Sequence, residues 1–378
     1  MTVDRVLTWL FAALLLLLAL STPALAHKAS DSFMYLNADA DSFRIDVALR
    51  DLALLLPLDS NGDGQVTGAE FRDQRANILS TVEAGIALSA GGQPCRLQGR
   101  DWGLTHHSDG AYAAASYRTL CPDGQSPDQL NYSLLFEQDS LHRGLLQISA
   151  GGETTLDVAG PDNQTLELRA AGDMELWRSF ATFVYEGVLH LMIGLDHLLF
   201  LLVLVLPASL FRHQPVNQER RWLPSRGQIL ELTAVVTAFT VAHSITLALA
   251  ALNLVSLPIA WVETVIAASI IVAAINVIWP VLGARTWLLA FGFGLIHGFG
   301  FASVLSELTA GAVSLAVALA GFNVGVELGQ LALLAVGFPL LTVLARATPM
   351  YRRALVPLTL IGVIGVSLIW VWERIPAA

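Results

Sequence analysis

The sequence predicts a two-part fold: a mainly-β extracytoplasmic domain with an EF-hand-like loop, followed by an all-α bundle of about six transmembrane helices. Of the 378 residues, 54% are hydrophobic and only 14% are charged, which is far more apolar than a soluble domain. The charges concentrate before about Arg178, among short alternating runs, whereas long uncharged runs fill the rest. We therefore expect a signal peptide at 1–26, a mainly-β domain at 27–175 and a transmembrane domain at 176–378.

The first 26 residues have the pattern of a cleavable signal peptide. Arg5 precedes the apolar run Trp9–Leu20, and Ala24-Leu-Ala26 has the small residues of a signal-peptidase site. An uncleaved anchor helix is the alternative, although the run is short for a membrane span. Cleavage would make His27 the first residue, and its amine and imidazole could chelate Cu²⁺ or Ni²⁺. A cleavage site without any role for His27 is the simpler interpretation.

The segment from His27 to Gly172 has the pattern of a small β-sandwich or barrel. Short alternating runs are separated by Gly, Pro, Asn and Asp, as in all-β domains; they are Phe43–Val47, Ala114–Leu120, Asn131–Phe136, Leu145–Ser149 and Thr165–Leu168. One stretch, Ala69–Leu88, has apolar residues at helical spacing, which predicts a helical insert.

This first domain carries the negative charge of the chain. Residues 27–178 contain 11 Lys or Arg against 22 Asp or Glu, a net charge of −11. Such a field repels nucleic acid and attracts cations. Both cysteines, Cys95 and Cys121, lie here, and an exported domain permits a disulfide. We expect them to pair; two buried thiols or soft-metal ligands are the alternatives.

A twelve-residue stretch matches the calcium loop of an EF-hand. Oxygen donors stand at positions 1, 3, 5 and 9, a glycine at position 6, and at position 12 a glutamate that can chelate through both oxygens. Position 7 contributes only its backbone carbonyl. The expected Ca²⁺ ligands are Asp59, Asn61, Asp63, Gln65, Thr67 and Glu70. A turn rich in Asp and Asn, without metal, is the alternative.

Six later runs approach or exceed the roughly 20 residues that a bilayer core requires. They cover 180–206, 229–252, 258–279, 286–306, 313–343 and 354–372. The fifth run is overlong, which suggests a tilt, a kink near Pro339 or a break near its glycines. Basic residues follow the first, third and fifth runs, so the N-terminal domain should lie outside a bacterial-type inner (plasma) membrane that the chain crosses several times.

Ionisable and amide side chains recur inside these runs, where they are costly and therefore indicate function. The candidate ligands of a divalent transition metal are Glu186, His190, Asp196, His197, His243, His297, Asn323 and Glu327. Imidazole with carboxylate oxygen suits Ni²⁺, Co²⁺ or Zn²⁺. Hydrogen bonds between helices, without metal, are the alternative.

The positions of these residues along their helices predict how they meet. His190, His243, His297 and Asn323 each lie about nine to eleven residues from the outer end of a span, near the midplane. His197 lies about 10 Å further along the same helix, so it needs a break near Gly194 or belongs to a second site. Asp196 points away from His190 and would orient a neighbouring imidazole.

Two of the runs share a short motif. Gly187-Val-Leu-His190 and Gly294-Leu-Ile-His297 are three spans apart, as in the inverted repeats of transporters. Chance explains so short a match better.

The stretch His190-Leu-Met-Ile-Gly-Leu-Asp196-His197 resembles the first-helix motif of the HupE/UreJ family, His-Pro-x-x-Gly-x-Asp-His. The resemblance extends over nearly the whole chain, including Phe239-Thr-Val-Ala-His243-Ser-Ile-Thr, Leu295-Ile-His297-Gly298-Phe-Gly-Phe and Phe322-Asn323-Val-Gly-Val-Glu327-Leu-Gly-Gln330. It implies a nickel or cobalt permease, of the branch with an exported N-terminal domain. Two departures are that Leu191 replaces the family's proline and that only His297-Gly298 remains of its second motif.

The sequence is therefore compatible with three functions. The first is a membrane transporter for Ni²⁺ or Co²⁺ that uses the midplane site, with the metal ion and the lipid bilayer as its partners. The second is an intramembrane Zn²⁺-dependent hydrolase with Glu327 or Glu186 as base. The third is a calcium-binding sensor or assembly protein with a periplasmic or homo-oligomeric partner. We expect transport rather than catalysis and assign no catalytic residue.

Overall fold

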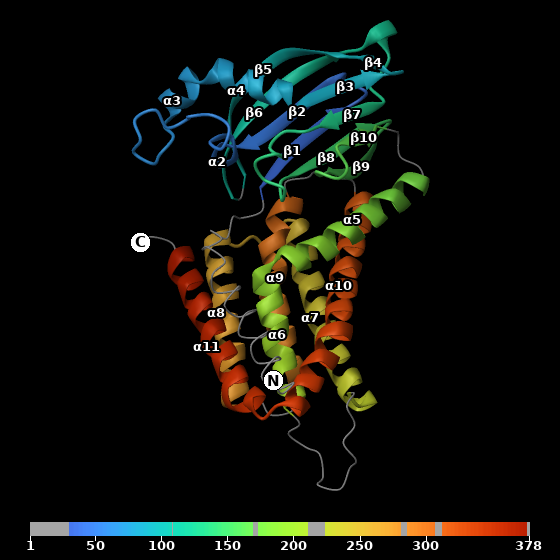
Figure 1. Cartoon of the computed structure of the whole chain (residues 1–378). Coiled ribbons are helices and arrows are strands. Elements are labelled where there is room, and N and C mark those ends of the chain that lie inside the picture. The colour runs from blue at the N-terminus through green and yellow to red at the C-terminus, as the bar shows by residue number, and fades with distance from the viewer. Residues whose placement is uncertain are drawn as a thin grey trace, which may run out of the picture. The chain divides into compact units, whose positions relative to one another are not determined.

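The computed structural model describes residues 30–107, 109–168, 173–210, 224–280, 286–306 and 312–375. The predicted signal peptide at 1–26 and His27 lie outside these residues. The chain forms two compact units, one built mainly from residues 27–182 and the other from residues 183–306 and 321–378. The first is rich in β-strands and the second is helical (Figure 1).

The β-rich unit contains two sheets. The six-stranded sheet has the order β5-β6-β2-β1-β8-β9 and the four-stranded sheet the order β10-β7-β3-β4. All of the pairs are antiparallel except β1 with β8, in which Asp31 is opposite Arg143. The strands are β1 (Asp31–Asn37), β2 (Ser42–Ala48), β3 (Ile86–Ala90), β4 (Gln93–Pro94), β5 (Arg96–His107), β6 (Gly110–Leu120), β7 (Gln129–Tyr132), β8 (Arg143–Ala150), β9 (Glu153–Ala159) and β10 (Thr165–Glu167).

One hydrophobic core joins the two sheets. Alternate residues of the large sheet, such as Ile45 and Leu146, pack with Leu88 and Leu130 of the small sheet. This follows from the two-residue period of a strand, which sends every second side chain to the same face. The predicted β-rich unit is therefore confirmed, and its described core has the form of a sandwich.

The helical insert of this unit is shorter than expected. Helices α3 (Gly68–Asp73) and α4 (Arg75–Ala84) follow the short α2 (Leu49–Leu52), and a 3₁₀ turn covers Pro122–Gly124. The helix ends at Gly85, and Ile86–Ala90 forms β3 instead, so the expectation of one helix over 69–88 is wrong at both its middle and its end. Ile86 and Leu88 are buried by strand pairing with β7, which local helical periodicity cannot reveal.

A buried histidine fixes the start of β1 inside this unit. His142 is fully buried, with its Nδ1 atom 2.5 Å from Ser30 Oγ and its Nε2 atom 2.7 Å from Tyr132 Oη. Burial lowers the pKa of His142 to about 3, so the ring is neutral near pH 7. Its hydrogen bonds satisfy an otherwise costly buried polar group.

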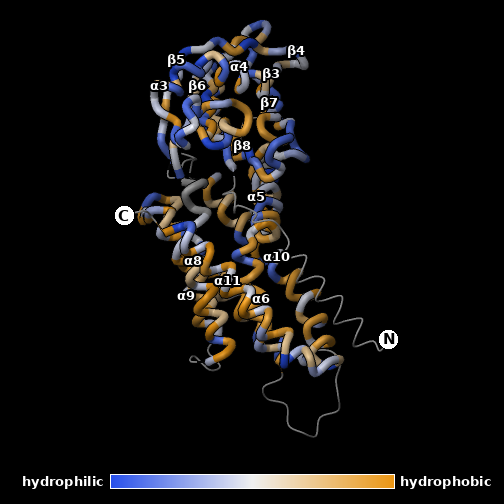
Figure 2. The backbone as a smooth tube through the Cα atoms, turned by 60° about the vertical axis from the view of Figure 1, so that its left-hand side comes forward, coloured by the Kyte–Doolittle hydropathy of each residue, from blue (hydrophilic) through white to orange (hydrophobic). Residues whose placement is uncertain are grey.

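The helical unit carries most of the long apolar segments (Figure 2). Its helices are α5 (Asp173–Ile193), α6 (Leu195–Ser209), α7 (Arg226–Ala251), α8 (Ile259–Ile278), α9 (Thr286–Ser306), α10 (Ala312–Ala347) and α11 (Val356–Arg374), the last preceded by a π-helical turn at Tyr351–Leu355. Four helical segments of the described chain are long and apolar enough to cross a membrane; these are α7, α8, α10 and the segment Tyr351–Arg374. The pair α5 and α6 makes a fifth span if counted as one.

A break separates α5 from α6, whereas the longest helix, α10, continues where a kink or a break was one expectation. The helix α10 continues through Pro339 to Ala347, whereas α5 and α6 are bent by 73° at Gly194. Helix α6 packs in the middle of the unit, where Phe200 and Val203 share a core with residues of α7, α8, α9 and α11. The bend therefore brings the second half of the first apolar run into the centre of the bundle.

Candidate metal-binding site

The break between α5 and α6 places two histidines side by side. Gly194 caps α6, and the rings of His190 and His197, on either side of it, are 5.0 Å apart between centroids. A Cβ atom at Gly194 would lie 2.8 Å from His197 Nδ1 and 2.9 Å from the carbonyl oxygen of His190. Only glycine leaves room for a ring folded back so closely against the chain.

His197 is the centre of a cluster of four imidazoles. Its ring is 5.2 Å from that of His297 on α9 and 6.4 Å from that of His243 on α7, in addition to its contact with His190. Residues His197, His243 and His297 are buried. The structure thus brings together four histidines that are spread over more than 100 positions of the sequence.

Three of these rings are held through Nδ1 while their Nε2 atoms have no hydrogen-bond partner among the described residues. His197 Nδ1 is 3.1 Å from Asp196 Oδ1, His243 Nδ1 is 3.2 Å from Asn323 Oδ1, and His297 Nδ1 is 2.9 Å from the carbonyl oxygen of Phe293. An acceptor at Nδ1 places the proton there and leaves a lone pair on Nε2. Metal-binding histidines are typically oriented in this way.

Asp196 and Asn323 therefore contact imidazoles directly. Asp196 Oδ1 also accepts a hydrogen bond from the backbone N–H of His197, which ties the carboxylate to the first turn of α6. Each of the two side chains positions a histidine in this structure.

Aromatic rings also surround the imidazoles, and none of them is among the predicted site residues. Phe239 contacts the rings of His197, His243 and His297, and Phe322 stacks on His243. Phe200 adds a contact with His297. The sequence contains a sign of this packing in Phe239, which lies one helical turn before His243. Such rings exclude water and strengthen any electrostatic interaction of the imidazoles.

A second polar contact joins α7 and α10 one turn away from the imidazoles. Thr237 Oγ1 donates to Glu327 Oε1 at 2.7 Å, and Thr240 Oγ1 donates to Gln330 Oε1 at 2.9 Å. The other oxygen of Glu327, Oε2, is buried without a hydrogen-bond partner in the described chain. Glu186, another candidate, lies one turn before His190 on α5.

In the described residues, no group of three or more His, Cys, Asp or Glu side chains is placed so that all of them could hold one metal ion together. The other three imidazoles lie around His197, with their ring centroids 5.0–6.4 Å from its own.

The loop with the calcium pattern lies in the β-rich unit before α3. Both oxygens of Asp59 accept backbone N–H groups, from Gly62 at 2.7 Å and from Gly64 at 2.7 Å, and these two glycines have φ values of 73° and 81°. Glu70 closes the loop, because its Oε1 accepts from Ser60 and its Oε2 from Thr67. Hydrogen bonds from the Thr67 backbone and hydroxyl, and from Ser60, lower the pKa of Glu70 to about 2.

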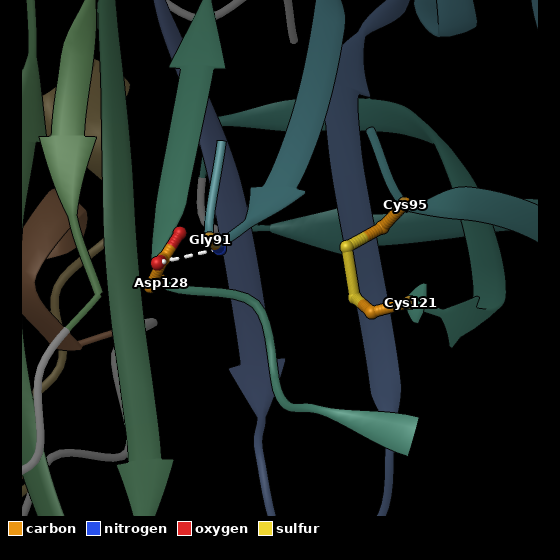
Figure 3. The surroundings of a disulfide bond; sticks show 4 residues. All are labelled: Gly91, Cys95, Cys121 and Asp128. Atoms are coloured by element: carbon orange, nitrogen blue, oxygen red, sulfur yellow. Dashed lines mark hydrogen bonds between the residues drawn. A yellow bond between two sulfur atoms is a disulfide. The ribbon is translucent and has the colours of Figure 1, made fainter. Parts of the chain in front are cut away.

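The two cysteines lie at the end of the β5–β6 hairpin. Cys95 directly precedes β5, Cys121 directly follows β6, and a disulfide joins them (Figure 3). Nearby, Asp128 Oδ2 accepts the backbone N–H of Gly91 at 2.9 Å.

Comparison with known families gives one result for this chain. A family model described as HupE / UreJ protein matches residues 165–374, which is more than half of the chain and includes the whole helical unit up to Arg374. No curated protein matches the chain.

Proposed function

The chain belongs to the HupE/UreJ family, and from this premise we propose that it carries a divalent transition-metal ion, Ni²⁺ or Co²⁺, across a membrane. The observation that carries the proposal is a set of three buried Nε2 atoms, on His197, His243 and His297, that have no hydrogen-bond partner in the described part of the chain. Burying a polar atom without a hydrogen bond is costly, so a set of three favours a ligand. Neutral imidazole nitrogen suits these two ions.

The arrangement of the imidazole cluster supports transient binding. An ion that meets one or two nitrogens at a time keeps part of its other coordination and can pass from one imidazole to the next. Conduction requires this balance, because a site that binds too tightly does not release. Asp196 and Asn323 hold their rings in place, and the carboxylate of Asp196 also offsets part of the charge of the cation.

The test is uptake of radioactive nickel by cells that express the full chain. We expect His197→Ala and His297→Ala each to reduce uptake at least tenfold, because each removes one imidazole nitrogen of the cluster. The matched control is His106→Ala, since His106 is exposed on β5 of the other unit. Equal uptake by the wild type, both cluster variants and the control would contradict the proposal.

A second measurement, metal analysis of the purified protein, separates transport from catalysis. A zinc-dependent hydrolase would hold its metal at a fixed site with an open position for water. Metal analysis of the purified protein should then find stoichiometric zinc that does not exchange with added ⁶⁵Zn²⁺ over hours. We expect rapid exchange instead.

We further propose that the helical unit crosses the membrane six times, with the β-rich unit outside. Exposed tryptophans support it: Trp279 and Trp287 flank the connection between α8 and α9, whereas Trp261 and Trp372 lie at the other ends of α8 and α11. Tryptophans gather at both interfaces of a bilayer. Alkaline phosphatase fused after Ala378 should be active, because six spans return the C-terminus to the outside; an inactive fusion with full expression would contradict the topology.

We propose as a second function that the loop Asp59–Glu70 binds Ca²⁺. Asp59 accepts a hydrogen bond from the N–H of Gly64, as the first residue of such a loop does. The predicted metal ligands would all bind through oxygen atoms, as Ca²⁺ requires. Calcium would replace the present hydrogen bonds of Glu70 with Ser60 and Thr67.

The variant Glu70→Gln tests this function sharply. Glutamine keeps the capping box with Thr67, so the fold should be retained, but it cannot chelate through two carboxylate oxygens. We expect 1 mM Ca²⁺ to raise the melting temperature of the wild type and of the control Asp73→Asn, and to leave Glu70→Gln unchanged. A calcium shift of the same size in all three proteins would exclude the loop.

A further inference from the structure

Two pairs of helices in the helical unit approach each other so closely that their backbones touch. In the first pair, α5 with α10, a methyl group at Gly187 would collide with the carbonyl oxygen of Phe322. The facing glycine, Gly325, is equally tight against Val184 and Gly187. Such contacts require small residues where the two helices come closest.

The second pair, α9 with α7, repeats this contact with equivalent residues. A methyl group at Gly294 would collide with the carbonyl oxygen of Phe239 and would lie 2.9 Å from Ala242 Cβ. Gly187 and Gly294 each stand three residues before a cluster histidine. Phe322 and Phe239 each stand three residues before the small residue that the glycine meets, Gly325 or Ala242.

A further contact occurs at corresponding positions of the two helix pairs, but the large and the small residue have changed places. Four residues after the first glycine stands Leu191 in α5 and Gly298 in α9; seven residues after the phenylalanine stands Gly329 in α10 and Thr246 in α7. A Cβ at Gly329 would lie 2.7 Å from Leu191 Cδ2, and one at Gly298 would collide with Thr246 Oγ1. Large faces small in both pairs, with the sides reversed.

The order of the helices along the chain fits an internal repeat that relates these two helix pairs. If α5–α6, α7 and α8 form one repeat and α9, α10 and α11 a second, then α5 corresponds to α9 and α7 to α10. The pair α5–α10 then maps onto the pair α9–α7, as the contacts require. The third helices, α8 and α11, also share one core, as two equivalent helices at a twofold axis would. Successive helices run in opposite directions, so three helices invert the second repeat relative to the first (Figure 1).

We infer that the helical unit consists of two inverted three-helix repeats, and that the pairs α5–α10 and α7–α9 are two rigid halves that rock against each other around the imidazole cluster. Inverted repeats of this kind serve transporters by alternating which side of the membrane reaches the central site. The rocking rests on the proposed transport, whereas the repeat does not.

The ligands of the cluster fit this division. His190 and His297 occupy equivalent positions, one in each repeat and one in each half. His243 breaks the symmetry, because its equivalent is Val326, and Glu327 does so as well, because its equivalent is Ser244. The contacts Thr240–Gln330 and Thr237–Glu327 cross from one half to the other, so they are the ones that rocking must change.

The repeat is tested by giving one pair the residues of the other. Gly329→Thr alone should lower the melting temperature of the purified full chain by several degrees, because its Cβ meets Leu191. Gly329→Thr with Leu191→Gly reproduces the Thr246–Gly298 contact and should recover at least half of the loss; Leu191→Ala replaces Leu191→Gly if the double variant fails to fold. Gly337→Thr, on the same helix with open space around it, is the control. Purely additive losses would overturn the repeat, and no metal is needed for this readout.

The rocking is tested by a link between the halves. Thr240→Cys with Gln330→Cys can be joined by a short bis-maleimide, since the described chain has no free cysteine of its own. We expect the linked protein in vesicles to bind Ni²⁺ with unchanged affinity and to lose at least 90% of its Ni²⁺ uptake relative to the same variant treated with N-ethylmaleimide. Equal uptake by both forms would overturn the rocking halves. Absence of Ni²⁺ uptake by the wild type would instead refute the proposed transport and leave the repeat to the first test.

Discussion

The imidazole ring of His190 lies 5.0 Å from that of His197, although an unbroken helix would separate the two residues by about 10 Å along its axis. The 73° bend at Gly194 produces this contact. The bend thus turns two positions of one apolar run into neighbours in a buried cluster.

We predict that Gly194→Ala weakens metal binding without unfolding the protein. The added methyl group would lie 2.8 Å from His197 Nδ1 and 3.2 Å from Asp196 Oδ1, so the ring and its carboxylate partner must shift. Calorimetric titration with Ni²⁺ should show at least a tenfold weaker affinity. Gly292→Ala, which meets open space on α9, is the control. Wild-type affinity in Gly194→Ala would show that the bend does not form the site.

A second prediction concerns the contact between α5 and α10. Gly187→Ala places a methyl group against the backbone of Phe322, which cannot yield as a flexible side chain would. Overpacking of this kind costs about 1–3 kcal/mol. We expect a melting temperature several degrees below that of the wild type, whereas Gly337→Ala on α10 should match it. Equal values for the two variants would indicate that the helices are not in backbone contact.

A third prediction concerns pH and the β-rich unit. Asp31 is only 8% exposed, and burial, with a contribution from Asp109, raises its pKa from 3.8 to about 8. Because the folded pKa lies above the unfolded one, the stability that Asp31 contributes is complete below about pH 4 and is lost as the pH rises through about 8.

Asp31→Asn removes this titration. Relative to the wild type, the free energy of unfolding of the variant should gain roughly 5 kcal/mol between pH 4 and pH 8, since one pKa unit corresponds to about 1.4 kcal/mol. Scanning calorimetry of the full chain at both pH values measures it, and Asp39→Asn, on an exposed turn, is the control. A difference between Asp31→Asn and wild type that does not change with pH would contradict the assignment.

The fourth prediction concerns the disulfide. It closes a loop with a sequence separation of 26, for which loop-closure entropy gives a stabilisation of about 3.5 kcal/mol. The double variant Cys95→Ser with Cys121→Ser should therefore lower the unfolding transition of the β-rich unit. Nickel binding by the imidazole cluster should be unaffected at 20 °C. An unchanged calorimetric transition would show that the bond adds little to stability.

Several features of the fold could be predicted because they depend on local sequence. Alternation of apolar residues predicts strands such as β2 and β8, and runs of about 20 apolar residues predict helices such as α7 and α8. The end of α4 could not be predicted, because Ile86 and Leu88 belong to β3 only when β7 is beside it. The parallel pairing of β1 with β8 joins residues more than 100 positions apart and leaves no local pattern.

The sequence by itself determined which side chains cost free energy inside the apolar helices, because an imidazole within a run of leucines and valines is visible from the neighbouring residues alone. It also supplied the glycines at 187 and 294. Only the tertiary structure decided that His197 joins His190, that Asn323 and Asp196 hold imidazoles, and that each glycine meets the backbone of a particular phenylalanine. The physical reason is that hydropathy and periodicity fix what a segment can bury, whereas the bend at Gly194 and the close packing of α5 with α10 and α7 with α9 fix which atoms meet.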